Sequence, residues 1–199
     1  MKTINIEIPD GKRAEWIDDV LTLIDENPKG VTYEDENPKC VMDEDENPKC
    51  VTERIKTFVD AVEELGVENQ LVREYFAMRS AGSRDLIAYL RLRIICAALN
   101  EGWQPKFTKD EWRYYPWFWL YTKDEVKNMS EEDKKNLVII DTNNYDTEYA
   151  GFTYAYSYDA SAKTTTIVGH RLCLKNHDLA EYCGKQFIYL WANYLLKRK

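Results

Sequence analysis

The segment EWRYYPWFWLYT, residues 111–122, contains seven aromatic residues among twelve and no Gly, so it favours a β-strand. Successive side chains of a strand point to opposite faces, which divides the segment into two sets. One set contains Trp112, Tyr114, Pro116, Phe118 and Leu120. The other contains Arg113, Tyr115, Trp117, Trp119 and Tyr121. Both faces are largely apolar, so both require cover from other parts of the protein.

Pro116 limits where this strand can lie in a sheet. Proline has no N–H to donate to a ladder, so it is confined to edge strands and bulges. Two interpretations of the second face follow. Helices cover one face and Tyr-bearing loops cover the other, or part of the second face stays exposed and binds a partner. The candidate partner-binding residues are Arg113, Tyr115, Trp117, Trp119 and Tyr121.

Aromatic residues beside arginine suit two kinds of partner. Trp, Tyr and Arg are enriched at the centres of protein interfaces, and they also stack on single-stranded bases. The nearby bases are few, and Asp110, Glu111 and Asp124 oppose them. We therefore rank a protein partner first and nucleic acid second. The nearby bases are Lys106, Lys109, Arg113 and Lys123.

The rest of the chain predicts an α+β fold. Apolar residues spaced three and four apart predict three helices, from Thr52 as N-cap to Gly66, over about 68–79, and from Ser83 to Gly102. We expect an antiparallel sheet of about four strands, with 111–122 beside strands at 151–158, 164–168 and 170–175. In 151–158, Phe152, Tyr154, Tyr156 and Tyr158 alternate with smaller residues, which predicts that all four share one face.

A long C-terminal helix is expected over 177–197, with Asn176 as its N-cap. Gly184 lies inside this helix, where glycine costs about 1 kcal/mol relative to alanine, so we expect it to permit close approach of a neighbour. We divide the chain into a small N-terminal β element (1–24), an acidic repeat (25–51) and a single α+β domain (52–199). In the β element, Ile4, Ile6 and Ile8 share a face, and Asp18-Asp19 is a candidate hairpin turn.

The acidic segment repeats nearly the same ten residues three times: DENPKGVTYE, DENPKCVMDE and DENPKCVTER, residues 25–54. This segment carries ten acids and four bases, and so accounts for −6 of the net charge of −8. One Val per decapeptide cannot build a core, which favours a solvated linker that grew by tandem duplication. DEDEN (43–47) could offer oxygen ligands to calcium, but it lacks the glycine and the distal glutamate of an EF-hand loop.

Composition excludes several classes of protein. No apolar run approaches the roughly 20 residues of a membrane span, and the N-terminus has no apolar signal-peptide region. Five cysteines without close pairing favour reduced thiols in a cytoplasm. The only histidines, His170 and His177, lie near Cys173 and Cys183, but the predicted strand and helix faces do not bring the four together at a tetrahedral zinc site. We therefore expect no metal, no cofactor and no catalytic residue.

Four ordered blocks carry a resemblance: ALNEGWQPKF (98–107), YYPWF (114–118), RLCLK (171–175) and LAEYCGKQF (179–187). With VTERIKTF (51–58), they resemble a family of uncharacterised proteins from phages and mobile elements of gut Bacteroidales. The resemblance covers most of the chain and implies a phage or mobile-element setting in a bacterial cytoplasm. It implies no activity. The tandem copies depart from the single such segment expected in that family.

These observations predict a non-enzymatic interaction or accessory protein that binds a protein partner, or itself, through the aromatic edge strand. The alternative is a nucleic-acid-binding module that uses the same strand. An enzyme of unrecognised type ranks third, because no motif requires one. We expect no membrane association.

The repeat generates a first testable prediction. Deleting residues 35–44 should leave the midpoint of thermal unfolding nearly unchanged, because halving or doubling a loop alters its closure free energy by only about 0.6 kcal/mol. Deletion of 35–54, which also removes the first residues of the predicted helix, is the companion variant. A loss of several kcal/mol in the shorter deletion would contradict the linker interpretation.

Overall fold

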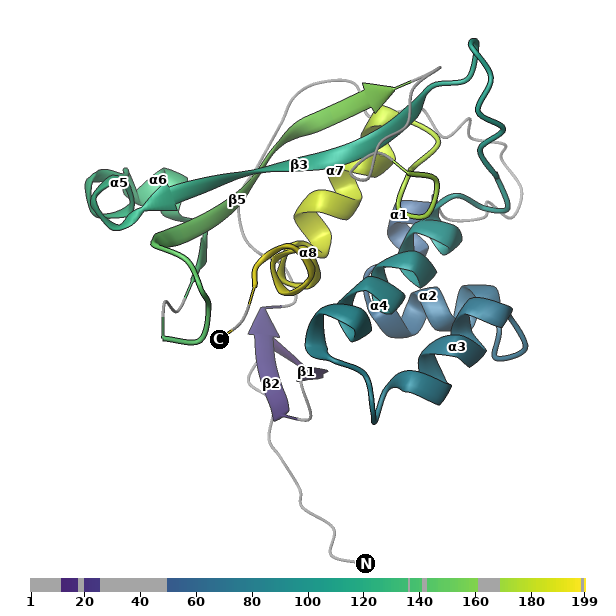
Figure 1. The fold of residues 1–199 in the computed structure, drawn as a ribbon, viewed down its shortest axis with the longest axis horizontal. Coiled ribbons are helices and arrows are strands. Elements are labelled where there is room, and N and C mark those ends of the chain that lie inside the picture. Colours follow the sequence, from purple (N-terminus) through teal and green to yellow (C-terminus); the bar gives the residue numbers. More distant parts are fainter. Residues whose placement is uncertain are drawn as a thin grey trace, which may run out of the picture.

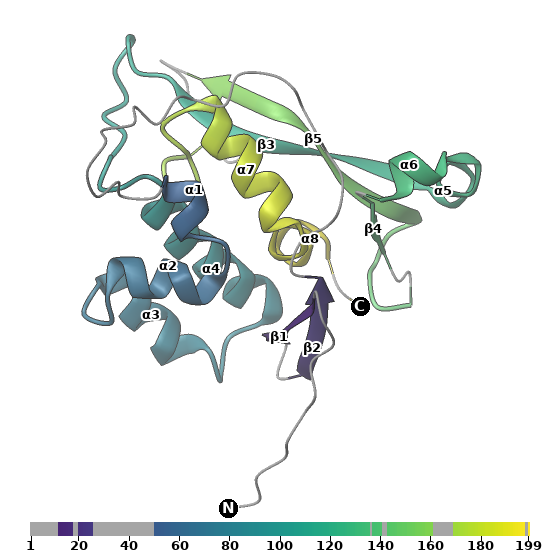
Figure 2. The same ribbon diagram turned by 180° about the vertical axis from the view of Figure 1, so that it is seen from behind.

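The computed structural model describes residues 50–135, 137–140, 143–160, 169–197 and 199, together with the backbone of two strands near the N-terminus. Its main body is α+β, as predicted, with helices packed on one side of an antiparallel sheet (Figure 1). The layers follow in order: the sheet, then the two C-terminal helices, then the long helix α4, and beyond it α2 and α3 (Figure 2). The main hydrophobic core extends through all of these layers.

The N-terminal strands are β1 (Lys12–Ile17) and β2 (Val20–Asp25), which pair antiparallel with each other. The candidate turn at Asp18-Asp19 lies outside the described residues. The remainder of the predicted N-terminal β element, including Ile4, Ile6 and Ile8, lies outside the described residues. So do residues 26–49 of the acidic repeat.

The helical layer precedes the sheet in the chain. Its most buried member is the sixteen-residue helix α4, whose Leu92, Ile94 and Ile95 are fully enclosed. Asn69 caps α3 by accepting a hydrogen bond from the Leu71 N–H. The four helices are α1 (Val51–Arg54), α2 (Phe58–Leu65), α3 (Gln70–Met78) and α4 (Arg84–Leu99).

The first predicted helix is in fact two helices, and the predicted N-cap is wrong. Thr52 lies inside α1, and the chain leaves the helical conformation at the fully buried Ile55. Thr57 caps α2, because its side chain accepts from the Asp60 N–H while the Asp60 carboxylate accepts from the Thr57 N–H. The predicted end at Gly66 is correct, with glycine in the left-handed region at φ 79°.

In the described part of the chain, the main sheet has three strands in the order β3-β5-β4. The four-strand expectation is not confirmed. Residues 170–175 form a turn with one isolated bridge instead of a strand, and 164–168 lie outside the described residues. The third strand comes from 138–139, where no strand was predicted, because two residues carry too short a pattern to detect. The strands are β3 (Arg113–Thr122), β4 (Val138–Ile139) and β5 (Tyr149–Ala160).

The connection from β3 to β4 contains two short helices, α5 (Lys123–Asn128) and α6 (Glu131–Lys134). Thr122 ends β3 and caps α5 at the same time, since its side chain accepts from the Glu125 N–H and its own N–H donates to the Glu125 carboxylate. The strand therefore has a fixed end at Thr122. Figure 1 shows both helices beyond the far end of the β3–β5 pair.

A β-bulge reverses the predicted face of two tyrosines. Trp117 pairs with Tyr156, whereas Phe118 pairs with Tyr154, so Ala155 is the extra residue on β5. Beyond the bulge, Tyr156 and Tyr158 share the face of Trp117 instead of the face of Phe152 and Tyr154. The expectation that all four aromatic residues of 151–158 share one face is therefore wrong.

The predicted C-terminal helix is broken at Phe187. It forms α7 (His177–Gln186) and α8 (Ile188–Leu195), which point in different directions in Figure 1. Phe187 is buried, with φ −111° and ψ 29°, and the Trp191 indole N–H donates to the Cys183 carbonyl at 3.3 Å. That bond helps satisfy a carbonyl near the break. The predicted N-cap is correct, since Asn176 accepts from the Leu179 N–H.

Gly184 is the contact point between α7 and the sheet, as the sequence predicted. A Cβ atom there would lie 2.6 Å from Cδ2 of Tyr154 and 2.7 Å from Cβ of Pro116. Real Cβ atoms do not approach other heavy atoms so closely, and Pro116 is held in the strand by its ring. Only glycine lets the α7 backbone approach β3 and β5 to this distance.

Substituting Gly184→Ala should therefore destabilise the fold. The gain in helix propensity of about 1 kcal/mol is outweighed by overpacking, so we expect a net loss of about 1–2 kcal/mol in the free energy of unfolding. Chemical denaturation measures the change. Gly169→Ala is the control, because a Cβ at Gly169 would meet no atom within 4 Å. Equal stability of the Gly184→Ala variant and the wild type would contradict the close-contact interpretation.

Candidate interaction surface

Strand β3 lies at the edge of the three-stranded sheet, as Pro116 predicted. On its open side, Tyr114 exchanges two backbone hydrogen bonds with Leu174, at 3.0 and 2.9 Å. Backbone groups of a strand alternate between its two edges, so the position two residues further on also faces away from β5. The nitrogen of Pro116 therefore faces the open side. Because it would not take part in the β3–β5 ladder, its missing N–H costs that ladder no hydrogen bond.

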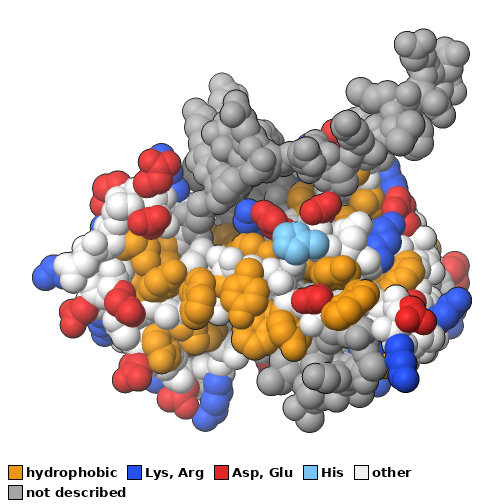
Figure 3. Space-filling view, turned by 90° about the horizontal axis from the view of Figure 1, so that it is seen from above, with side chains coloured by type: hydrophobic (Ala, Val, Ile, Leu, Met, Phe, Trp, Pro, Cys, Tyr) orange, Lys and Arg blue, Asp and Glu red, His pale blue; other side chains and the backbone are white. Residues whose placement is uncertain are grey.

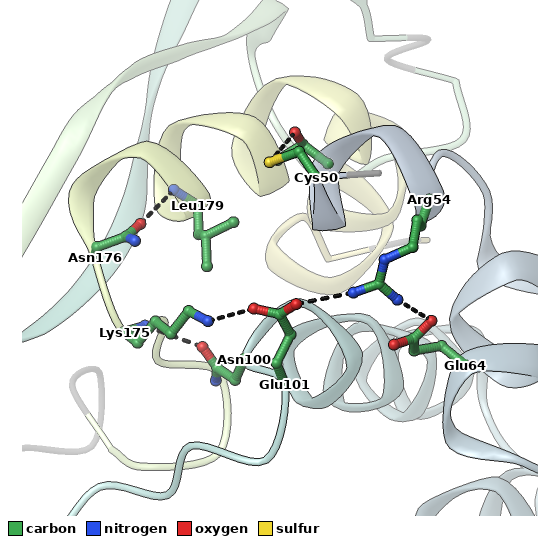
Figure 4. Close-up of polar contacts among 9 residues, drawn as sticks. Cys50, Arg54, Glu64, Asn100, Glu101, Lys175, Asn176 and Leu179 are labelled. Atoms are coloured by element: carbon green, nitrogen blue, oxygen red, sulfur yellow. Dashed lines mark hydrogen bonds and ion pairs between the residues drawn. The ribbon is translucent and has the colours of Figure 1, made fainter. Parts of the chain in front are cut away.

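A buried amide fixes the Leu174 segment against helix α4. The Asn100 side chain donates to the Cys173 carbonyl at 2.8 Å. It also accepts from the Lys175 N–H at 3.0 Å (Figure 4). Asn100 is only 6% exposed, so these bonds are shielded from water. The end of α4 thus positions the segment that pairs with the beginning of β3.

Charged residues at the protein surface add to this contact between the end of α4 and the 173–175 segment, which we call the Asn100 joint. Glu101 adopts a left-handed backbone conformation, φ 49°, and its carboxylate accepts from Lys175 at 2.6 Å and from Arg54 at 2.8 Å. Arg54 also pairs with Glu64, which links α1, α2 and the end of α4 (Figure 4). The hydrogen bond from Lys175 and the charges of Lys175 and Arg54 lower the pKa of Glu101 below its ordinary value of 4.5.

The first half of the candidate face is buried. Arg113 is 0% exposed, and its guanidinium lies 4.0 Å from the centre of the Phe107 ring. Tyr115 is 6% exposed, and its hydroxyl donates to the Gly169 carbonyl at 2.5 Å. Burial raises the pKa of Tyr115 well above its ordinary value. These two residues hold the strand in place and do not present a surface to a partner.

The second half of the face is open. Trp117 is 39% exposed and Trp119 is 55% exposed, while Tyr121 is half-buried. Figure 3 looks down on the molecule from above the sheet and shows hydrophobic side chains gathered in a band between charged ends. Within the candidate set, Trp117, Trp119 and Tyr121 are therefore the residues that a partner could reach.

Two tyrosines on β5 complete the exposed group. Tyr156 is 45% exposed and stacks on Trp117, with ring centres 5.8 Å apart and planes at 15°. Tyr158 is 40% exposed and lies 5.4 Å from Trp117, and Trp119 meets Tyr156 edge-on at 6.4 Å. We call Trp117, Trp119, Tyr156 and Tyr158 the aromatic face. The sequence analysis missed its two tyrosines, because regular alternation places them on the opposite face and nothing in the sequence marks the bulge.

The surroundings of the aromatic face carry both signs of charge. Lys106, Lys109 and Lys123 are exposed, but each lies close in sequence to Asp110, Glu111 or Asp124. Arg113 is the one base on β3 itself, and it is buried. Over the described residues, β3 and β5 therefore bring no exposed cation to the aromatic face, whereas binding of phosphate groups requires clustered cations.

The two histidines and their neighbouring cysteines do not form a cluster. His170 and His177 are exposed, whereas Cys173 and Cys183 are buried and both lie near the buried thiol of Cys96. Over the described ranges, no three His, Cys, Asp or Glu side chains are arranged to hold a metal ion. In the same part of the chain, no helix combines the length and apolarity needed to cross a membrane.

Comparison with known proteins returned no match: no family model, no curated protein and no solved structure is similar to this chain. The geometry of the chain itself is therefore the basis for assigning a function.

The charged joint generates a prediction about pH. Because the folded-state pKa of Glu101 is lowered, its contribution is fully present above pH 4.5 and is lost as the pH falls through the folded-state value. Glu101→Gln should reduce the free energy of unfolding at pH 7 by less than about 1 kcal/mol, since the side chain is 41% exposed.

The difference between wild type and Glu101→Gln should shrink as the pH is lowered from 5 towards 3, measured by urea denaturation at each pH. Glu63→Gln, on the exposed side of α2, is the control and should show little difference throughout. A Glu101→Gln difference that stays constant with pH would show that the ion pairs do not contribute.

Proposed function

We propose that this protein is a non-enzymatic interaction protein that binds protein surfaces through its aromatic face. The observation that carries the proposal is the exposure of four aromatic side chains, linked by three ring contacts, on the outer face of an edge strand and its neighbour. Large exposed aromatic groups on a folded protein mark interaction sites, and Trp and Tyr are the residues that contribute most to protein interfaces.

The aromatic face is also held ready for binding. Trp117 contacts both tyrosines, so its ring is already packed on one side before a partner arrives. The strand beneath it is fixed at one end by the Tyr114–Leu174 bridge and at the other by the Thr122 cap. A preorganised surface loses less conformational entropy on binding, which favours affinity.

The proposed setting is the cytoplasm of a bacterium that carries a phage or mobile element. Cys96, Cys173 and Cys183 are buried free thiols, which supports a reducing compartment. The resemblance to proteins from phages of gut Bacteroidales supports the phage setting. A host protein or a phage protein is then the expected partner.

Substitutions on the two faces of β3 separate binding from stability. Trp119→Ala should change the free energy of unfolding by no more than about 1 kcal/mol, because the side chain is more than half exposed. Phe118→Ala is the matched control on the inner face, where the ring stacks on Phe152 at 4.7 Å and lies 5.6 Å from Trp191. It should cost about 3 kcal/mol.

Binding is measured with the same folded variants. Wild-type protein on beads should capture one or more defined proteins from a phage-bearing Bacteroidales lysate, and Trp117→Ala should lose at least about 2 kcal/mol of that association. Fluorescent oligo(dT) is the competing probe for base stacking. Tight, salt-sensitive binding of oligo(dT) that depends on Trp117, or capture that Trp117→Ala leaves unchanged, would overturn the proposal.

A further inference from the structure

The open edge of β3 presents unused backbone groups beside the aromatic face. Backbone direction alternates along a strand, and the bulge lies on β5, so Phe118 and Leu120 direct their N–H and C=O groups to the same open side as Tyr114. Among the described residues, none donates to or accepts from these groups on that side. The open stretch is bounded by the Leu174 bridge at one end and by helix α5 at the other.

The edge has little protection against pairing. Natural sheets defend exposed edges with charged side chains, prolines or bulges that interrupt the ladder. Here Pro116 protects only the beginning of the stretch, and residues 114–122 contain no charged side chain. A strand added here would therefore meet no charged side chain along this edge. Two copies of the chain, although each has a net charge of −8, would not repel each other at this edge.

We infer that the partner of this edge is a second copy of the same strand, paired antiparallel about a two-fold axis at Trp119. This inference rests on the proposed function, since it names the partner of the same strand. In this register Phe118 of each copy pairs with Leu120 of the other, which uses every open N–H and C=O of both residues. The two Trp119 side chains face each other across the axis on the outer side of a six-stranded sheet.

The ends of the edge fit this register. Pro116, which has no N–H, falls opposite Thr122 of the other copy, whose N–H is already bonded to Glu125. The two positions that cannot contribute a donor therefore face each other. Antiparallel pairing also brings the acidic first turn of α5, with Asp124, towards the exposed Arg171 beside the Leu174 bridge of the other copy.

Cross-linking tests the position of the axis. Trp119 and its counterpart form a non-hydrogen-bonded pair with Cα atoms about 4.5 Å apart, within the roughly 4.4–6.8 Å that a disulfide spans. Trp119→Cys should therefore give a covalent dimer when oxidised with copper–phenanthroline and oxygen, as seen on a non-reducing gel. Trp117→Cys is the matched control, because two copies of residue 117 would lie about 13 Å apart along the strands.

Sedimentation velocity tests the edge itself. Wild type should dimerise, and Leu120→Pro should weaken dimerisation at least about tenfold, or about 1.4 kcal/mol, because it removes an edge N–H. Because that N–H is not part of the β3–β5 ladder, the midpoint of thermal unfolding of Leu120→Pro should stay close to that of the wild type. Leu120→Lys is the second variant, which places a charge on the edge without altering the backbone.

Three results would overturn the inference: a monomeric wild type at high micromolar concentration, equal cross-linking by Trp117→Cys and Trp119→Cys, or a Leu120→Lys variant that is folded and fully dimeric. The proposed function is judged separately, by Trp117→Ala, which changes the aromatic face and keeps the edge. A monomeric chain that captures a protein through Trp117 disproves self-pairing alone. A dimer whose Trp117→Ala variant captures the same proteins as wild type disproves binding by the aromatic face alone.

Discussion

The approach of helix α7 to the sheet at Gly184 is the constraint on which the arrangement of β3 and β5 depends. Because no side chain separates the helix from Pro116 and Tyr154, the inner face of the sheet is filled by helix backbone and ring atoms at contact distance. Phe118 and Phe152 continue this packing towards Trp191 on α8. At Gly184 the inner face leaves no space even for a Cβ atom. Beyond the bulge at Ala155, Tyr156 and Tyr158 lie with Trp117 on the outer face.

Sequence patterns predicted features that are set by local backbone chemistry. Pro116 could only occupy an edge or a bulge. The side chain of Asn176 can accept a hydrogen bond at a helix start, and Gly66 can adopt the positive φ that ends a helix. The α+β class followed from the change of apolar period after residue 103. Gly184 was predictable as well, because glycine inside a helix is unfavourable unless a neighbour requires the space.

The errors arose where tertiary contacts override local pattern. Thr52 and Thr57 are both plausible N-caps, and burial of Ile55 decides between them by ending α1. The apolar stripe of 177–197 continues through Phe187, but the turn to α8 places Trp191 next to Phe118. The bulge at Ala155 changes the face of every β5 residue beyond it, and it becomes visible only in the pairing of β5 with β3. Each of these changes depends on contacts with other parts of the fold, which the local sequence pattern does not show.

Only half of the candidate surface could be predicted from the sequence, because tertiary contacts also decide which of its residues are buried. Alternation correctly placed Trp117 and Trp119 on one face, but it could not show that Phe107 and Gly169 would bury Arg113 and Tyr115 on that face. That cover depends on the two hydrogen bonds of the Asn100 side chain to the Cys173–Lys175 backbone. These bonds hold this segment, and with it the preceding turn, beside the start of β3. The joint thus divides the strand into a buried half that anchors it and an open half that can bind.

The segments that suggested a family resemblance meet at this joint and at the Gly184 contact. Asn100, Tyr114, Cys173 and Gly184 each lie in one of the four blocks, and together they connect α4, β3, the 169–175 turn and α7. Three members of the aromatic face, Trp119, Tyr156 and Tyr158, lie outside those blocks. The four blocks on which the expected resemblance rested therefore contribute residues that build the scaffold, and such residues specify a fold without specifying an activity. A function for this protein has to be argued from the surface that the scaffold presents, and the exposed aromatic side chains beside an open strand edge are its most distinctive feature.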